Sequence, residues 1–121
     1  MINLQSIFIW PSGSCSDFDL VDRVLNRLHS QNKIRKIFVA NRFSVARYAE
    51  RWAKQTGVDF KKYSSENKEE IDRVFSNGID LVSLAFSEES PNEFSKKVCN
   101  KYGKDFFIYA RLGPSFYGKK L

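Results

Sequence analysis

Residues on which many enzymes and metal proteins depend are scarce in this chain of 121 residues. It has two cysteines, Cys15 and Cys99, without CxxC spacing, and a single histidine, His29. Two isolated thiols make neither a disulfide framework nor a zinc site, and one histidine makes Ser-His, Cys-His and His-metal chemistry unexpected. No apolar run approaches the roughly 20 residues of a membrane span, so no membrane contact is expected. The sequence predicts no metal and no other cofactor.

The residues that are abundant predict a folded, basic domain. Hydrophobic residues make up 42% of the chain and aromatic residues 15%, which excludes a disordered protein. The formal net charge of +6 favours an anionic partner, namely a nucleotide, a nucleic acid or an acidic protein surface, although the charge can also serve solubility alone. The amino-terminal sequence MINLQSIFIW lacks a basic n-region, so no signal peptide is expected and a cytoplasmic location is predicted.

Apolar runs and amphipathic patterns alternate along the chain. Strands are predicted over 6–10, 36–40, 58–63, 81–86 and 106–110, with helices over 17–31, 44–57, 67–76 and 91–102. Five strands alternating with four helices imply right-handed crossovers. We therefore predict a single Rossmann-like, doubly wound α/β domain with a mostly parallel sheet over residues 1–110. Residues 111–121 are expected to be a basic, extended C-terminal tail that can pack through Phe116 and Tyr117.

The segment 34–58 contains a strand, the short loop sequence ANRFS and an amphipathic helix. Ser44 can cap the start of this helix and Gly57 can close its end, while Tyr48 and Trp52 lie on its apolar face and are expected in the core. In open α/β sheets, ligands bind beyond the carboxyl ends of the strands, next to the donor-rich helix starts. The expected crevice is formed by four loops, at residues 11–16, 40–44, 63–65 and 87–92.

Several of these segments resemble the YspA-type branch of the SLOG superfamily, a Rossmann-like group that includes DprA and the cytokinin-activating LOG enzymes. The resemblance covers about residues 4–110 and is carried by SIFIWPSGSCSDFDL, by the helix sequence AERWA and by the strand LVSLAF. It implies a nucleotide-related ligand at the family's glycine loops. Here ANRFSVA replaces the first glycine loop and SEESPNEF the second, which argues against the ordinary phosphate cradle and against LOG-type phosphoribohydrolase activity.

Eight residues in these loops or in the helix start that follows ANRFS are the expected ligand-binding set. They are Ser12, Gly13, Asn41, Arg42, Ser44, Arg47, Glu88 and Glu89. In one interpretation Arg42 and Arg47 contact an anionic group while the serines and Asn41 supply hydrogen bonds; in the other the loop is vestigial and Arg42 is solvated. Glu88 and Glu89 are either acid/base or metal-binding groups or part of a solvated acidic loop. No catalytic residue is assigned.

These observations lead to competing hypotheses of function. The first is a non-enzymatic SLOG-like protein that binds a nucleotide or a nucleotide-derived anion at the C-terminal edge of the sheet, as a sensor or sequestering protein. The second is a degenerate domain that binds nucleic acid or an acidic protein through its basic surface. A hydrolase of N-glycosidic bonds rests on fold analogy alone. Domains of this size often dimerise through exposed helices, so a homodimer is among the expected assemblies.

Overall fold

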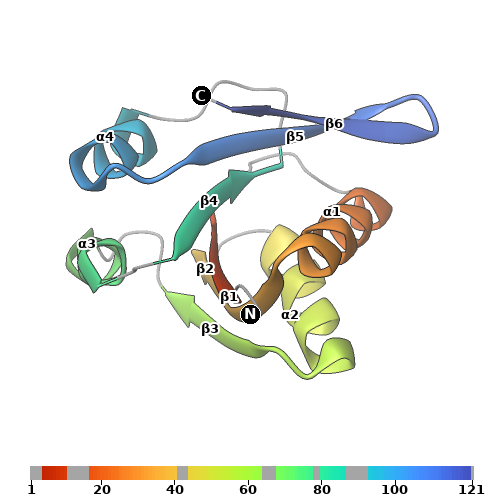
Figure 1. The fold of residues 1–121 in the computed structure, drawn as a ribbon, viewed down its shortest axis with the longest axis horizontal. Helices are drawn as coiled ribbons and strands as arrows, with labels where there is room; N and C mark the ends of the chain where they lie inside the picture. The colour runs from red at the N-terminus through yellow and green to blue at the C-terminus, as the bar shows by residue number, and fades with distance from the viewer. Residues whose placement is uncertain are drawn as a thin grey trace.

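The computed structural model describes residues 4–10, 17–40, 44–63, 68–77, 80–86 and 93–120. Strands and helices alternate along most of the chain, and the last two strands follow each other directly (Figure 1). The elements are β1 Leu4–Ile9, α1 Phe18–Gln31, β2 Lys33–Ala40, α2 Ser44–Thr56, β3 Asp59–Tyr63, α3 Lys68–Asn77, β4 Leu81–Ala85, α4 Glu93–Tyr102, β5 Phe106–Leu112 and β6 Ser115–Lys120.

The strands form one mixed sheet in the order β3-β2-β1-β4-β5-β6. All neighbouring strands are parallel except β5 and β6. The predicted α/β class and the mostly parallel, doubly wound sheet are therefore confirmed. The sheet has six strands where the sequence predicted about five.

The additional strand comes from the segment expected to be an extended tail. Gly113 adopts a φ of 55°, which glycine reaches without steric cost, and the chain turns back so that β6 pairs antiparallel with β5. Phe116 packs against the hydrophobic core from this strand, whereas Tyr117 is 43% exposed. Residues 115–120 thus belong to the sheet.

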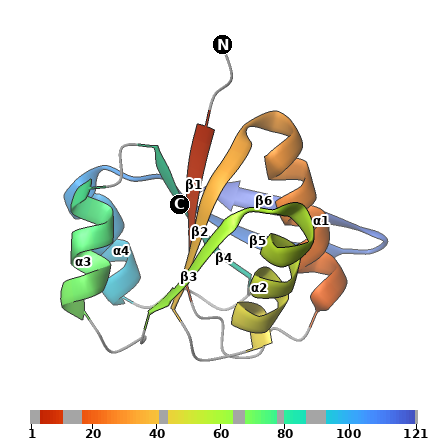
Figure 2. The ribbon, with the colours of Figure 1, turned by 90° about the horizontal axis from the view of Figure 1, so that it is seen from below.

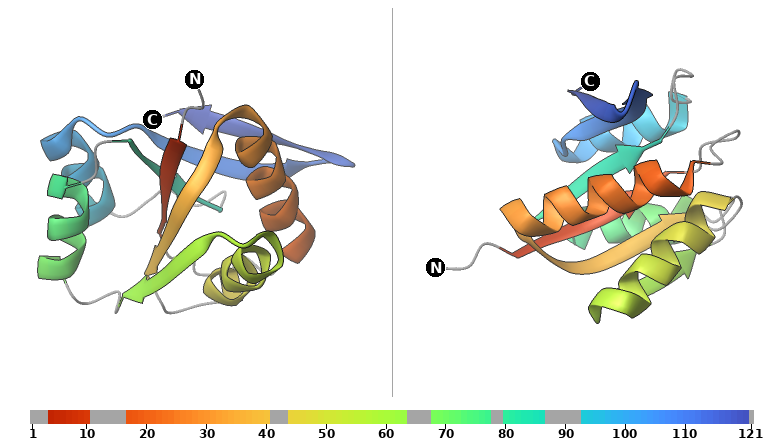
Figure 3. Two further views of the ribbon diagram at one scale, coloured as in Figure 1. Left: turned by 60° about the horizontal axis from the view of Figure 1, so that its bottom comes forward. Right: turned by 90° about the vertical axis from the view of Figure 1, so that its right-hand side faces the viewer.

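The helices cover the two faces of the sheet in pairs. Figures 2 and 3 show α1 and α2 on one face and α3 and α4 on the other. The core under α1 and α2 contains Trp52, which is 2% exposed as expected, with Tyr48 half-buried at its margin. The core under α3 and α4 is built around Phe8 and Phe75. Among the described helices, none has the length and apolar character needed to cross a membrane.

The ends of α1 and α2 follow from their capping residues. The Asp17 carboxylate accepts a hydrogen bond from the Leu20 amide at 3.0 Å, which satisfies a free donor of the first turn of α1. After α2, Gly57 has a φ of 74° and Val58 donates its amide hydrogen to the Ala53 carbonyl, as in a left-handed helix end. Local signals of this kind account for the close agreement between the predicted and observed bounds of these two helices.

The path of the chain after β3 leaves part of the sheet uncovered. Because β4 pairs with β1 rather than with β3, α3 crosses to the opposite face, and its apolar residues pack with β1, β4 and α4. Both helices on that face therefore lie over the middle of the sheet and over β5. The same face of β2 and β3 has no helix of its own within the described part of the chain, and the candidate site lies there.

Candidate functional site

Most of the residues predicted to bind a ligand lie outside the described part of the chain. These are Ser12, Gly13, Asn41, Arg42, Glu88 and Glu89. Ser44 is the first residue of α2, and its capping and ligand-binding roles stay predictions. Arg47 lies on the exposed side of α2 among Glu50, Arg51 and Lys54. Arg47 is therefore on the α1/α2 side of the sheet.

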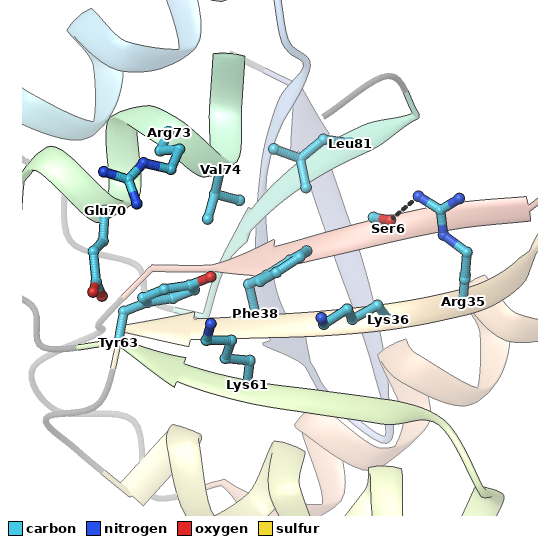
Figure 4. A pocket seen from close by; sticks show the side chains of 10 residues that line it. All are labelled: Ser6, Arg35, Lys36, Phe38, Lys61, Tyr63, Glu70, Arg73, Val74 and Leu81. Carbon is cyan, nitrogen blue, oxygen red and sulfur yellow. Dashed lines mark hydrogen bonds between the residues drawn. The ribbon is translucent and has the colours of Figure 1, made fainter. Parts of the chain in front are cut away.

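A cavity of about 270 Å³ opens on the opposite side, between the uncovered part of the sheet and α3 (Figure 4). Residues of four strands and one helix line it. They are Ser6, Arg35, Lys36, Phe38, Lys61, Tyr63, Glu70, Arg73, Val74 and Leu81. The cavity thus combines aromatic, cationic and apolar side chains that come from distant parts of the sequence.

Strand alternation explains which side chains of β2 and β3 reach the cavity. Successive side chains of a strand point to opposite faces of its sheet. In β2, Ile37 and Val39 enter the core under α1 and α2, so Lys36 and Phe38 point to the cavity side. In β3, Lys61 and Tyr63 share that side. Each strand therefore presents a Lys-x-aromatic pair to the same face.

A bulge adds Arg35 to this face. Gln5 of β1 pairs with Ile34, but Ser6 pairs with Lys36, so Arg35 is the extra residue of β2. Bulges re-aim the side chain next to them, and here Arg35 and Lys36 both line the cavity. The Arg35 Nη2 donates a hydrogen bond of 3.1 Å to the Ser6 hydroxyl, which is 3% exposed. This bond holds the guanidinium at the cavity.

Phe38 and Tyr63 form an aromatic pair across β2 and β3. Their ring centroids are 6.0 Å apart and their planes differ by 23°, so the rings are nearly parallel. The ammonium of Lys36 lies 5.0 Å from the Phe38 ring, and that of Lys61 lies 5.1 Å from the Tyr63 ring. Both distances are within the range of cation–π attraction, which places the ammonium groups directly beside the rings.

The charges around the cavity are predominantly positive. Arg35, Lys36, Lys61 and Arg73 line it together with one carboxylate, that of Glu70. Figure 4 shows Arg35 and Lys36 toward one end of the cavity, and Arg73 and Glu70 on α3 toward the other end, across the cavity from Tyr63. A planar aromatic group with attached anionic groups is complementary to this arrangement, because the rings offer stacking surface and the cations offer charge-assisted hydrogen bonds.

The described cysteine and the histidine have structural roles. Cys99 is 3% exposed, and burial raises the pKa of its thiol, which keeps it protonated and unreactive. The Nδ1 of His29 accepts a hydrogen bond of 3.0 Å from the Ile34 amide, at the entry to β2. Within the described residues, no group of three or more His, Cys, Asp or Glu side chains could hold a metal ion.

Sequence reasoning missed this cavity, although a signal for it was present. The two strands contain the sequences Lys36-Ile37-Phe38 and Lys61-Lys62-Tyr63, in which a lysine and an aromatic residue fall on one face. The prediction treated the β2 segment as buried on both faces because three apolar residues follow one another. Only the strand order shows that these two patterns lie side by side on a face without a helix.

Comparison with known proteins adds no identification. A scan against protein-family models finds no match, and a search of curated proteins finds no relative. The resemblance to the YspA-type branch of the SLOG superfamily therefore stays a prediction.

Proposed function

We propose that this chain is a SLOG-like binding protein for a nucleotide or a nucleotide-derived anion. The observation that carries the proposal is the near-parallel Phe38–Tyr63 pair in a cavity lined by four cationic side chains. A nucleobase stacked on aromatic rings contributes about 1–3 kcal/mol per base to binding. Phosphate oxygens accept charge-assisted hydrogen bonds from Arg and Lys, and Arg35 is already oriented by Ser6.

The position of the cavity fits the predicted binding edge in part. Tyr63 is the last residue of β3 and pairs with Ala40, the last residue of β2, so the cavity reaches the carboxyl ends of both strands. Asn41 and Arg42, which the sequence predicts to bind the ligand, follow Ala40 directly in the chain and lie outside the described residues. From the carboxyl ends of the strands the cavity extends back along β2 to Arg35, near the start of that strand. The sequence predicted ligand contacts only beyond the carboxyl ends of the strands.

The volume of the cavity limits the ligand. About 270 Å³ is near the lower end of the roughly 300–1,000 Å³ usual for small-ligand sites. One base with its sugar is the largest part of a nucleotide that we expect to be enclosed, with the phosphates at the cationic rim. The proposed role is that of a sensor or a sequestering protein in the cytoplasm, with the ligand released unchanged.

Isothermal titration calorimetry against a panel of mononucleotides, cyclic nucleotides and NAD derivatives tests the proposal. We expect saturable binding of at least one member at sub-millimolar concentration and recovery of the intact ligand by chromatography. Phe38→Leu should weaken that binding by roughly five- to 150-fold, because an aliphatic side chain keeps the volume but removes the stacking surface.

The matched control is Tyr117→Leu, which removes an exposed aromatic ring of β6 that does not line the cavity. It should bind like the unmodified chain. Thermal unfolding of both variants checks that they are folded. No binding across the panel, or equal affinity of Phe38→Leu and the unmodified chain, would rule out a nucleotide on this aromatic pair.

A further inference from the structure

A second pocket lies on the other face of the sheet, between α1 and the hairpin of β5 and β6 (Figure 1). We call it the hairpin pocket. Its volume is about 230 Å³. It is lined by Val24, Arg27, Leu28, Gln31, Tyr109, Phe116, Tyr117 and Gly118. It shares no lining residue with the cavity of the Phe38–Tyr63 pair, so a ligand of the hairpin pocket is independent of the proposed function.

Aromatic side chains form an apolar floor in the hairpin pocket. The rings of Tyr109 and Phe116 have centroids 6.1 Å apart and planes at 64°. A Cβ atom at position 118 would lie only 2.6 Å from Cε1 of Tyr109, so the glycine allows this ring to lie against the backbone of β6. Leu28 adds partly buried apolar surface from α1. This floor suits the body of an organic molecule better than a bare inorganic ion.

The polar side chains of the hairpin pocket can all donate hydrogen bonds. The Arg27 guanidinium lies 5.6 Å from the centroid of the Phe116 ring, and this cation–π contact holds it at the pocket. Gln31 contributes an amide and Tyr109 a hydroxyl. Within the described part of the chain, no hydrogen bond or ion pair involves any of these three side chains. No Asp or Glu is among the lining residues, so the pocket presents unpaired donors and one positive charge.

The environment of Tyr109 keeps its hydroxyl available as a donor. Burial raises the pKa of Tyr109, and the positive charge of Arg27 acts in the opposite direction. The hydroxyl therefore stays protonated at neutral pH. The effect of Arg27 on this pKa also indicates that the guanidinium and the hydroxyl are close enough to act on the same group.

The donors and the single charge together define a class of ligand. A carboxylate carries one negative charge, which Arg27 balances, and its two oxygens accept several hydrogen bonds. A phosphate ester group carries a charge of about −1.5 to −2 at pH 7 and calls for more cations. We infer that the hairpin pocket binds a small organic monocarboxylate, whose oxygens accept hydrogen bonds from Arg27, Gln31 and Tyr109. The apolar body of this ligand lies against Phe116.

NMR titration of the ¹⁵N-labelled chain with benzoate tests this inference, with benzamide as a neutral analogue of nearly the same size. We expect saturable shifts of the Gln31 side-chain amide and of the backbone amides of Tyr117 and Gly118, with a Kd on the order of 1 mM. Benzamide should bind at least about tenfold more weakly, because it lacks the charge that strengthens the hydrogen bonds. Phenyl phosphate should bind no more tightly than benzoate.

Two substitutions test the donors. Arg27→Gln should weaken benzoate binding by at least about tenfold, because it removes the charge that pairs with the carboxylate. Tyr109→Phe should weaken it by roughly two- to tenfold, because the ring stays and only the hydroxyl is removed. Arg23→Gln is the matched control, since it makes the same change one turn earlier on α1, at an arginine that pairs with Asp19 and does not line the pocket. Its affinity should equal that of the unmodified chain.

Four results would overturn the inference. They are no saturable shift with benzoate, equal affinity for benzamide, an equal loss in Arg27→Gln and Arg23→Gln, and shifts confined to Phe38 and Tyr63, which line the other cavity. Thermal unfolding checks that each variant is folded. None of the variants changes a residue of the Phe38–Tyr63 cavity, so nucleotide binding should be unaffected in all of them. Failure of one proposal therefore leaves the other standing.

Discussion

Asp17 connects the start of α1 to the second-to-last strand of the sheet. Its carboxylate caps α1 through Leu20 and also accepts two hydrogen bonds from Arg111, at 2.9 and 2.8 Å. Arg111 reaches Asp19 as well, at 2.9 Å. The bidentate bond from Arg111, with the Leu20 amide, lowers the pKa of Asp17. The capping role of Asp17 could be predicted from sequence, but its partner lies in the segment expected to be a tail.

The lowered pKa of Asp17 predicts how stability depends on pH. Because the folded-state pKa is below the unfolded value of about 3.9, the pairing stabilises the chain above that value and is lost as pH falls through the folded-state pKa. Arg111→Met should lower the free energy of unfolding more at pH 6 than at pH 2, because the carboxylate that it pairs with is fully charged only at the higher pH. Urea unfolding at both pH values measures this, and an equal loss at both would contradict it.

At the scale of elements, helices with strong local signals could be predicted and pairings between distant elements could not. The apolar face and the closing glycine of α2 are contained in one short segment, so its bounds follow from sequence. β6 has only six residues and is exposed along most of its length, so its pattern resembles that of a basic tail. The cavity depends on β2, β3 and α3 being neighbours, which no single segment encodes.

The packing of β6 gives a prediction at this scale. Phe116 contacts the hydrophobic core and lies against Tyr109, with ring centroids 6.1 Å apart, whereas Tyr117 is exposed on the same strand. Phe116→Ser should lower the free energy of unfolding by about 1–3 kcal/mol, because half-buried apolar surface is replaced by a polar side chain. Tyr117→Ser should change it by less than about 0.5 kcal/mol. Equal effects in chemical denaturation would mean that β6 is not packed as described.

For the whole molecule, the topology creates the site by covering the sheet unevenly. Helices α1 and α2 cover one face of the sheet, and α3 lies over the middle of the other face. No described element covers β2 and β3 on that second face. A sheet face that no helix covers is compatible with contact with water only if it carries polar groups. The lysines and arginines of the cavity meet that need, and they also make the face attractive to anions.

The charge of the whole molecule should act on the rate of binding, and the cavity on the lifetime of the complex. The double variant Lys97→Glu and Lys119→Glu changes two exposed residues outside the cavity and reduces the net charge from +6 to +2, since each reversal removes two units. Long-range attraction raises association rates and is screened over about 30 Å at 0.01 M salt but about 3 Å at 1 M.

Stopped-flow binding of a fluorescent nucleotide should therefore show association slowed by about threefold or more at 0.01 M salt, with little difference at 1 M. Dissociation should be unchanged, because the contacts in the cavity are intact. Lys61→Gln, which removes the ammonium beside the Tyr63 ring, should instead mainly accelerate dissociation. If the double variant accelerated dissociation as much as Lys61→Gln does, the ligand would be held by the general basic surface and not by the Phe38–Tyr63 cavity.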